Sequence, residues 1–118
     1  MLRYSIDPMS LATICFLGHC YPALVGQTTP PGQYVLSQRI VLSPGYGGDV
    51  LTFKEEERDL LGIHRVWTGK VSEHRMERLA SSKVVERKGV TGGCINVSIA
   101  TYDLLVDCCS NASLLINQ

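Results

Sequence analysis

The sequence lacks any long apolar run, and this absence excludes one class of protein. No stretch reaches the roughly 18 consecutive apolar residues that a transmembrane helix needs, so no such helix is expected. The sequence also lacks a net charge, because its 11 basic residues are balanced by 11 acidic residues. A nucleic-acid-binding domain usually carries a basic patch or stripe, so nucleic acid is not an expected partner. We find no internal repeat and no low-complexity segment.

The N-terminal segment lacks the clean pattern of a secretory signal peptide. Arg3 stands before a fairly apolar stretch, residues 10–25, but Asp7 and Pro8 interrupt the approach and Pro22 breaks the stretch itself. We expect this segment to belong to the folded domain. If the protein acts outside the cytoplasm, we expect its export signal to have been removed or to be of a non-standard kind.

The chain has enough apolar residues to form a core by itself. Its 118 residues are 45% hydrophobic and 19% charged, which is typical of a globular domain. Chains split into several domains only at greater lengths, so residues 1–118 are expected to form one domain.

Cysteine is frequent for so short a chain. The five are Cys15, Cys20, Cys94, Cys108 and Cys109. Because the number is odd, at least one thiol stays free if the others pair within the chain. Two disulfides and one reactive thiol would suit an oxidising compartment, whereas a reduced protein would bury four of them as small apolar residues. The adjacent pair is not expected to bridge to itself.

The first half is expected to consist of short strands separated by turns. Aromatic, β-branched and aliphatic residues form the runs, and Pro- and Gly-rich turns at 28–32 and 43–48 separate the later ones. The expected strands are residues 4–7, 11–17, 21–25, 33–42 and 50–53. In 33–42, alternation predicts one face made of Tyr34, Leu36, Gln38, Ile40 and Leu42.

Helices are expected only in the second half. Residues 54–59 form a charged loop, and residues 60–67 and 90–99 follow strand patterns. Apolar residues at spacings of three to five predict a helix over 71–85, and a final helix is expected from Thr101 to include Leu114. The fold class predicted is therefore mostly β (α+β), one mixed sheet curled toward a sandwich or barrel with one or two flanking helices.

One stretch carries the chemistry, and it reads Thr91-Gly92-Gly93-Cys94-Ile95-Asn96-Val97. Two glycines let the backbone approach a substrate closely, and the N–H groups of such a turn can face a developing oxyanion. A cysteine there can attack a carbonyl if a base removes its proton, and His64 is the best candidate base. The alternative is a tight turn beside a buried thiol.

Three segments stand in a characteristic order, and they are Thr29-Pro30-Pro31-Gly32-Gln33-Tyr34, Gly62-Ile63-His64 and Thr91-Gly92-Gly93-Cys94-Ile95-Asn96-Val97-Ser98. This order resembles the catalytic domain of the L,D-transpeptidase (YkuD-like) family. That family shows Thr-Pro-x-Gly-x-Tyr/Phe, then Ile-His-Gly, then Ser/Thr-x-Gly-Cys-Ile/Leu-Arg/Asn. The resemblance spans roughly residues 4–116 and implies a fold of that type.

The resemblance implies a role for each matching residue. Cys94 would be the nucleophile and His64 its base, with Thr91 as a further catalytic residue. Gly92 and Gly93 would support the oxyanion, with amides of Gly93 and Cys94 donating to it, and Asn96 would support the site. The Pro-Pro-Gly segment is interpreted as a structural turn. Asp103 and Asp107 are interpreted as residues of the final helix rather than as catalytic groups.

The sequence departs from the family pattern in three places. Arg65 follows the histidine where glycine is common, and Gly92 stands where histidine is frequent. The segment between His64 and Cys94 is also longer, so residues 68–88 are expected to form an insertion that covers the site as a lid. Its basic side chains, with Arg65, are candidates for binding a substrate carboxylate: Arg75, Arg78, Arg87 and Lys88. Alternatively, each lies on a solvated helix face.

The implied reaction is acyl transfer on peptidoglycan tetrapeptide stems. Cys94 would release the terminal D-alanine, and an amine, water or a D-amino acid would resolve the thioester. The products would be a 3-3 cross-link, a shortened stem or an exchanged terminus. No cofactor is expected. The place of action would be the periplasm or cell envelope, and a secreted antibacterial toxin with an immunity or delivery partner is a second possible role.

Two rival functions come from other classes. One is a zinc module, in which Cys15, His19 and Cys20 would be joined by Cys108 and Cys109. The other is an inactive domain that binds cell-wall peptide without turnover. Metal analysis would test the first and a thiol-reactive probe the second.

Overall fold

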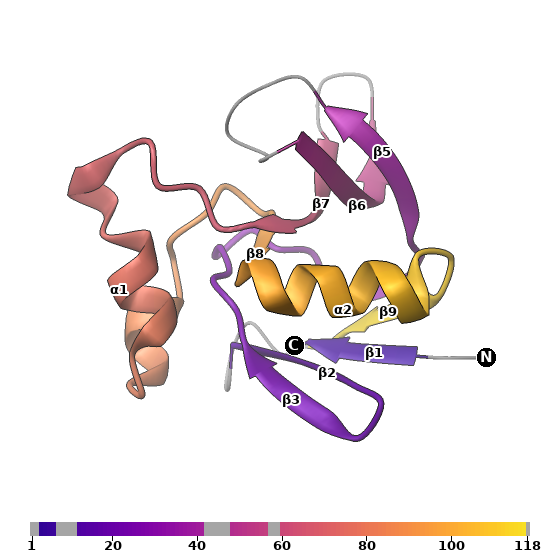
Figure 1. The fold of residues 1–118 in the computed structure, drawn as a ribbon, viewed down its shortest axis with the longest axis horizontal. Helices are drawn as coiled ribbons and strands as arrows, with labels where there is room; N and C mark the ends of the chain where they lie inside the picture. The colour runs from indigo at the N-terminus through magenta and orange to yellow at the C-terminus, as the bar shows by residue number, and fades with distance from the viewer. Residues whose placement is uncertain (1–2, 7–11, 42–47, 57–59, 118) are drawn as a thin grey trace.

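The computed structural model describes residues 3–6, 12–41, 48–56 and 60–117. Within them, the strands form two sheets (Figure 1). The first sheet has the order β3-β2-β1-β9-β4. The first and last of the described strands along the chain, β1 and β9, lie side by side in it and run parallel. Its strands are β1 Arg3–Ile6, β2 Thr13–Phe16, β3 His19–Pro22, β4 Gly32–Val35 and β9 Ser113–Ile116.

The second sheet contains the strands that carry His64, Arg65 and Asn96. Its order is β5-β6-β7-β8; β5, β6 and β7 pair antiparallel, whereas β7 and β8 pair in parallel. These strands are β5 Ser37–Val41, β6 Gly48–Glu55, β7 Leu60–Arg65 and β8 Ile95–Val97. A parallel pair needs a long crossover between its strands, and here the segment 66–94 supplies it.

A buried connector joins the two sheets. After β3 the chain runs through residues 23–26, all of them buried, and Leu24 forms an antiparallel bridge with Asn96 of β8. The backbone N–H of each of these two residues donates to the carbonyl of the other, at 2.8 and 2.9 Å. The connector therefore lies along the free edge of β8, where it saturates that edge.

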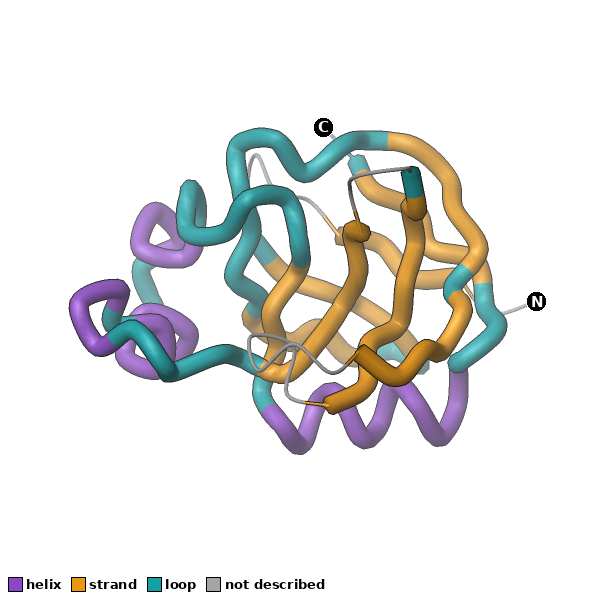
Figure 2. The backbone as a smooth tube through the Cα atoms, turned by 90° about the horizontal axis from the view of Figure 1, so that it is seen from above, coloured by secondary structure: helices purple, strands orange, loops and turns teal. Residues whose placement is uncertain are grey.

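Helix α2, Ile99–Cys109, packs across the strands and completes the core. Its start is determined locally, because the Ser98 side chain accepts a hydrogen bond from the Thr101 N–H as an N-cap. Figures 1 and 2 show the helix along one side of the strands. Residues that belong to both sheets and to this helix meet in one apolar cluster, and the largest fully buried side chains include Ile14, Leu51, Ile63, Ile95, Tyr102, Leu105 and Leu114. None of the described helices is long and apolar enough to cross a membrane.

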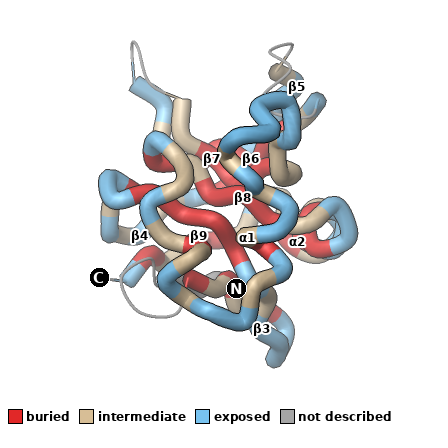
Figure 3. The backbone as a smooth tube through the Cα atoms, turned by 90° about the vertical axis from the view of Figure 1, so that its left-hand side faces the viewer, coloured by how far each residue is buried: buried red, intermediate tan, exposed pale blue. Residues whose placement is uncertain are grey.

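The segment between β7 and β8 contains three short helices instead of one. They are η2 Val71–Glu73, α1 Arg75–Ala80 and η3 Val84–Arg87, and they stand apart from the strands at one end of the molecule (Figures 1 and 2). The predicted helix over 71–85 is broken at His74, whose backbone is left-handed with φ 51°. Figure 3, seen from this end, shows exposed backbone in front of the buried strands.

The predicted mixture of strands and flanking helices is confirmed, but several elements besides the helix over 71–85 were predicted wrongly, and the strand predicted over 21–25 is β3 His19–Pro22. The strand over 33–42 is two strands in different sheets, which separate at buried Leu36, so Ile40 is 81% exposed instead of sharing a buried face. Leu114 lies in β9 and not in the last helix, which ends at Cys109. In the segment 90–99, only Ile95–Val97 is a strand. Leu42 and the turn residues 43–47 lie outside the described residues.

The cysteines form two disulfides and leave Cys94 free. Cys15 and Cys20 face each other across the β2–β3 hairpin, which brings their side chains together. Cys108 is joined to Cys109, so the prediction that this pair would not bridge was wrong. The two residues occupy the last positions of α2, where the backbone carbonyls lack helical partners and the helix is least constrained.

Candidate functional site

The pairing of β7 with β8 brings the predicted base close in space to the segment that carries the predicted nucleophile. His64 is in register with Asn96, and Ile63 with Ile95, so His64 and Asn96 share a face of the sheet. Cys94 directly precedes β8, and the backbone of Gly62, the residue before Ile63, hydrogen-bonds its thiol. Local sequence alone does not contain this relation, because it depends on the register of two strands joined by a long insertion.

His64 is held by hydrogen bonds at both ring nitrogens. Its Nδ1 lies 2.8 Å from the Arg65 carbonyl oxygen, and its Nε2 lies 3.2 Å from Asn96 Nδ2. A carbonyl can only accept, so Nδ1 carries the proton and Nε2 is the acceptor. The ring is 4% exposed, and its burial lowers the pKa of His64 below the ordinary 6.5, with the Arg75 charge adding to the effect. The imidazole is therefore neutral near pH 7, as a general base must be.

Cys94 provides a thiol directly before β8. Its Sγ lies 3.6 Å from the Leu60 carbonyl oxygen, a weak contact for an S–H donor. Burial raises the pKa of Cys94 above the ordinary 9.0, although the Gly62 backbone and the Arg75 charge act against this. In this structure the pair is therefore a neutral thiol and a neutral imidazole, and attack requires that the proton leave the thiol as the new bond forms.

The turn before Cys94 is closed by the hydroxyl of Thr91. Thr91 Oγ1 donates to the Cys94 carbonyl and accepts from the Gly93 N–H at 3.2 Å. Gly93 has φ 127°, a conformation that L side chains rarely adopt. The structure thus gives Thr91 a role in shaping the turn, and it directs the Gly93 amide to Thr91 rather than to open space.

A second segment, residues 26–29, holds this turn from outside, and sequence reasoning missed its role. The hydroxyls of Thr28 and Thr29 donate to the carbonyls of Gly92 and Gly93 at 3.3 and 3.0 Å. Gly26 lies so close to the turn that a Cβ there would collide with the Thr91 carbonyl and come within 2.9 Å of the Gly93 nitrogen. The Thr-Pro-Pro-Gly motif, interpreted above only as a turn, was the signal available for Thr29.

Arg75 is the arginine of the insertion that reaches the site. Its Nη1 donates to Asn96 Oδ1 at 2.8 Å, and its Nη2 lies 3.4 Å from Glu73 Oε2. The guanidinium also lies over the Trp67 ring, 5.5 Å from the ring centroid. Its side chain is only 12% exposed, so the insertion packs this arginine inward.

The other candidate arginines of the insertion bind backbone. Arg78 donates to the carbonyls of Glu86 and Lys88, at 2.6 and 3.2 Å. Arg87 is buried and donates to the carbonyls of Ala12 and Ser81. Their guanidinium groups therefore tie the insertion to itself and to the first sheet.

Arg65 lies on the opposite face of β7 from His64, as alternation along the strand requires. Its Nη1 pairs with Asp49 Oδ1 at 2.7 Å, and its guanidinium stacks on the Tyr102 ring. Tyr102 and Gln38 also donate to Asp49. Burial would raise the pKa of Asp49, but these hydrogen bonds and the arginine charge outweigh it and lower the pKa to about 2. Arg65 thus connects the sheet to α2, away from Cys94.

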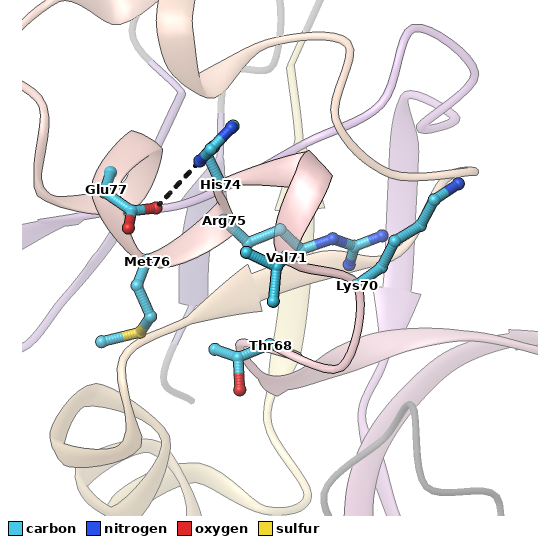
Figure 4. A pocket seen from close by; sticks show the side chains of 7 residues that line it. All are labelled: Thr68, Lys70, Val71, His74, Arg75, Met76 and Glu77. Atoms are coloured by element: carbon cyan, nitrogen blue, oxygen red, sulfur yellow. Dashed lines mark ion pairs between the residues drawn. The ribbon is translucent and has the colours of Figure 1, made fainter.

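A small pocket lies on the insertion beside Arg75, with a volume of about 140 Å³ (Figure 4). Val71 and Met76 supply apolar walls, and His74 pairs with Glu77 at 3.8 Å. Figure 4 shows the Arg75 guanidinium extending away from this ion pair. Arg75 is the lining residue that also hydrogen-bonds Asn96, so it joins the pocket to the site.

The cysteines that the zinc hypothesis requires as ligands are not thiols in this structure. Cys15, Cys20, Cys108 and Cys109 are consumed by disulfides, and a disulfide sulfur is not the thiolate that zinc binds. In the part of the chain that the structure describes, no group of three or more His, Cys, Asp or Glu residues is placed to hold a metal ion.

Solved structures show which fold these two sheets and their helices make. An L,D-transpeptidase from Mycobacterium tuberculosis H37Rv matches with a TM-score of 0.66 over 99% of this chain, at 16% identity. The chain has the L,D-transpeptidase fold. One from Mycobacterium smegmatis matches with a TM-score of 0.63 over 99% at 17% identity, and one from Xylanimonas cellulosilytica DSM 15894 with 0.60 over 98% at 18% identity.

These L,D-transpeptidases are longer than the present chain. It covers 57% of the length of the M. tuberculosis protein, 58% of the M. smegmatis protein and 60% of the X. cellulosilytica protein. No protein-family model matches the sequence, and no curated protein matches it. The similarity at this identity concerns the fold, so the roles of individual residues depend on the geometry described above.

Proposed function

We propose that this domain is a cysteine acyl-transfer enzyme that acts on peptidoglycan stem peptides, with Cys94 as nucleophile and His64 as base. The observation that carries the proposal is the β7–β8 register. Cys94, the free cysteine, stands two residues before Asn96, and Asn96 is the register partner of a buried, neutral histidine. The L,D-transpeptidase fold supports the choice of substrate class, since the solved relatives carry that name.

The first step forms a thioester. The Cys94 sulfur attacks the carbonyl that precedes the terminal D-alanine of a tetrapeptide stem, and its proton passes to His64 Nε2, whose single lone pair must first release the N–H of Asn96. The carbonyl oxygen then bears negative charge, which the Cys94 N–H would stabilise as an oxyanion-hole donor. The C–N bond breaks, and His64 returns the proton to the leaving nitrogen, so D-alanine departs with a neutral amine and the acyl group stays on sulfur.

The second step returns the enzyme to its starting state. An acceptor donates a proton to His64 and attacks the thioester, the C–S bond breaks, and Cys94 recovers its proton. An amine of a second stem gives a 3-3 cross-link, water gives a tripeptide, and a free D-amino acid gives an exchanged terminus. The acceptor depends on how far the bound acyl group is shielded from water.

The insertion, residues 68–88, is proposed as the lid that provides this shielding. The contact of Arg75 with Asn96 places its inner side next to the site. Arg78 and Arg87 give it an internal framework through their bonds to carbonyls. The place of action would be the cell envelope, where the two disulfides are stable, either in wall maintenance or as a secreted antibacterial toxin.

The direct test is intact mass spectrometry after incubation with purified disaccharide tetrapeptide. The wild type should gain the mass of the stem minus D-alanine, and the free stem should lose D-alanine or dimerise. Cys94→Ala is the control and should do neither. If the wild type forms no adduct and releases no D-alanine, the proposal is wrong and a peptide-binding module takes its place.

The protonation states predict an unusual pH profile for the thiol. Burial raises the pKa of Cys94 above 9.0, so alkylation by iodoacetamide should accelerate as pH rises to and beyond 9. A thiolate–imidazolium pair would instead give a flat rate from about pH 4 to 8. The disulfides leave Cys94 as the reactive thiol, so one added mass reports this site.

The same states predict the pH dependence of acylation by substrate. Burial lowers the pKa of His64 below 6.5, so the base is lost only as pH falls through that lowered value. The value of kcat/KM should therefore rise with pH to a plateau, with the midpoint of the rise below 6.5. A midpoint above 7 would contradict a buried, neutral base.

A further inference from the structure

Arg75 occupies a specific place between the insertion and the site. It is the first residue of α1, and its Nη1 donates to Asn96 Oδ1 at 2.8 Å. The other end of the Asn96 side chain, Nδ2, lies 3.2 Å from His64 Nε2. The three side chains thus form a chain of hydrogen bonds from the insertion to the predicted base.

The direction of this chain follows from donor and acceptor chemistry. A guanidinium has five N–H donors and no acceptor, so only the oxygen of Asn96 can face Arg75. The amide NH₂ of Asn96 must then face His64, and Nε2 must accept from it. The proton of the neutral ring is left on Nδ1, where the Arg65 carbonyl accepts it at 2.8 Å.

We propose that Arg75 is a positioning residue that fixes the orientation of the Asn96 amide and thereby, together with the Arg65 carbonyl at Nδ1, the tautomer of His64. The tautomer with the proton on Nδ1 is the one whose Nε2 can take a proton from a thiol. Without Arg75, the Asn96 amide can turn over and offer its oxygen to Nε2–H, the tautomer that cannot act as a base there. This inference concerns the same site as the proposed function and gives the insertion a part in it.

The contacts of Arg75 differ from those of an arginine that only braces the fold. Arg78 and Arg87 direct their guanidinium groups to backbone carbonyls. Arg75 instead donates to a side chain of the site, while its Nε and Glu73 Oε1 are buried without a hydrogen bond to described residues. An ion pair left with unmatched groups is poorly arranged for stability alone. Its geometry is explained by the contact with Asn96.

The test reads the tautomer directly and does not need turnover. The ¹⁵N shifts and two-bond ¹H–¹⁵N couplings of the imidazoles are recorded at about pH 8, above the ordinary histidine pKa of about 6.5. His19→Gln and His74→Gln assign the His64 signals by elimination. In the wild type, Nδ1 of His64 should have the shift of a protonated nitrogen and Nε2 that of an unprotonated one. In Arg75→Met, both shifts should move toward each other as the second tautomer is populated.

Matched variants separate positioning from general loosening of the insertion. Arg78→Met removes a guanidinium from the same helix, but Arg78 donates to the Glu86 carbonyl instead of to Asn96. The His64 shifts should therefore stay as in the wild type. Arg75→Lys keeps a cationic donor and should restore part of the wild-type pattern. Unchanged His64 shifts in Arg75→Met, or equal changes in Arg78→Met, would overturn the proposal.

Kinetics then distinguish positioning from substrate binding. If Arg75 positions the base, Arg75→Met should lower kcat by about twofold with little change in KM, as expected when about half of the population holds the wrong tautomer. A rise in KM at constant kcat would overturn the proposal in favour of a carboxylate contact. If no variant, wild type included, turns over stem peptide while the tautomer shift is present, the proposed function fails and the positioning role stands.

Discussion

Cys94→Ala is expected to abolish acylation by tetrapeptide, and His64→Gln to slow it by about 10²–10⁴-fold, the usual contribution of a general base. The reason is the geometry of β7 and β8. His64 is the register partner of Asn96, which stands two residues after Cys94, and burial keeps the Cys94 thiol protonated until a base removes the proton. The measurement is the rate of adduct formation by intact mass.

Thermal unfolding of each variant checks that the fold is intact. Glutamine at position 64 keeps a polar partner for Asn96, so the buried amide is not left without a hydrogen bond. A His64→Gln rate within about threefold of the wild type would rule out the proposed base.

Gly26→Ala is expected to cost about 3 kcal/mol of unfolding free energy, near the upper end for overpacking, and to lower the melting temperature by about 10 °C. The added Cβ would collide with the Thr91 carbonyl and press on the Gly93 nitrogen. These are backbone atoms of the turn that ends at Cys94, so they cannot yield as a flexible side chain would. Acylation should fall with stability because the turn itself must move.

Gly92→Ala is the matched control for this change. It adds the same methyl group to the turn itself, but its Cβ would meet no atom within 4 Å, and its φ is not in the left-handed region. The expected loss of stability is therefore within about 0.5 kcal/mol, as for an exposed site. Thermal unfolding followed by circular dichroism measures both variants side by side. Equal melting temperatures would show that the connector does not brace the turn.

Local sequence predicts well those elements whose conformation depends on their own residues. The Gly-Gly-Cys turn was predicted because glycine permits a φ of 127° at Gly93, which few other residues adopt. The L,D-transpeptidase-like fold was predicted because three short motifs stand in a fixed order along the chain. The same residues also indicated which of five cysteines would remain a thiol.

The elements predicted wrongly are those whose partners are distant in sequence. Leu114 has the same apolar character in a helix or a strand, and its pairing with β1 and β4 made it a strand. Residues 33–42 alternate well enough for one strand, yet the chain changes sheets at Leu36 to bury that side chain. Periodicity is a weak guide where an apolar run is short.

The sequence by itself determined the reactive groups of this protein and the local shape of the turn that carries the thiol. Only the tertiary structure decided which groups meet. It selected Arg75 from several arginines, placed Arg65 on the opposite face of β7, and joined Thr29 to Gly93 across 64 positions. The physical reason is that a turn depends on backbone torsions of adjacent residues, whereas a hydrogen bond between side chains depends on strand register and packing across the whole chain.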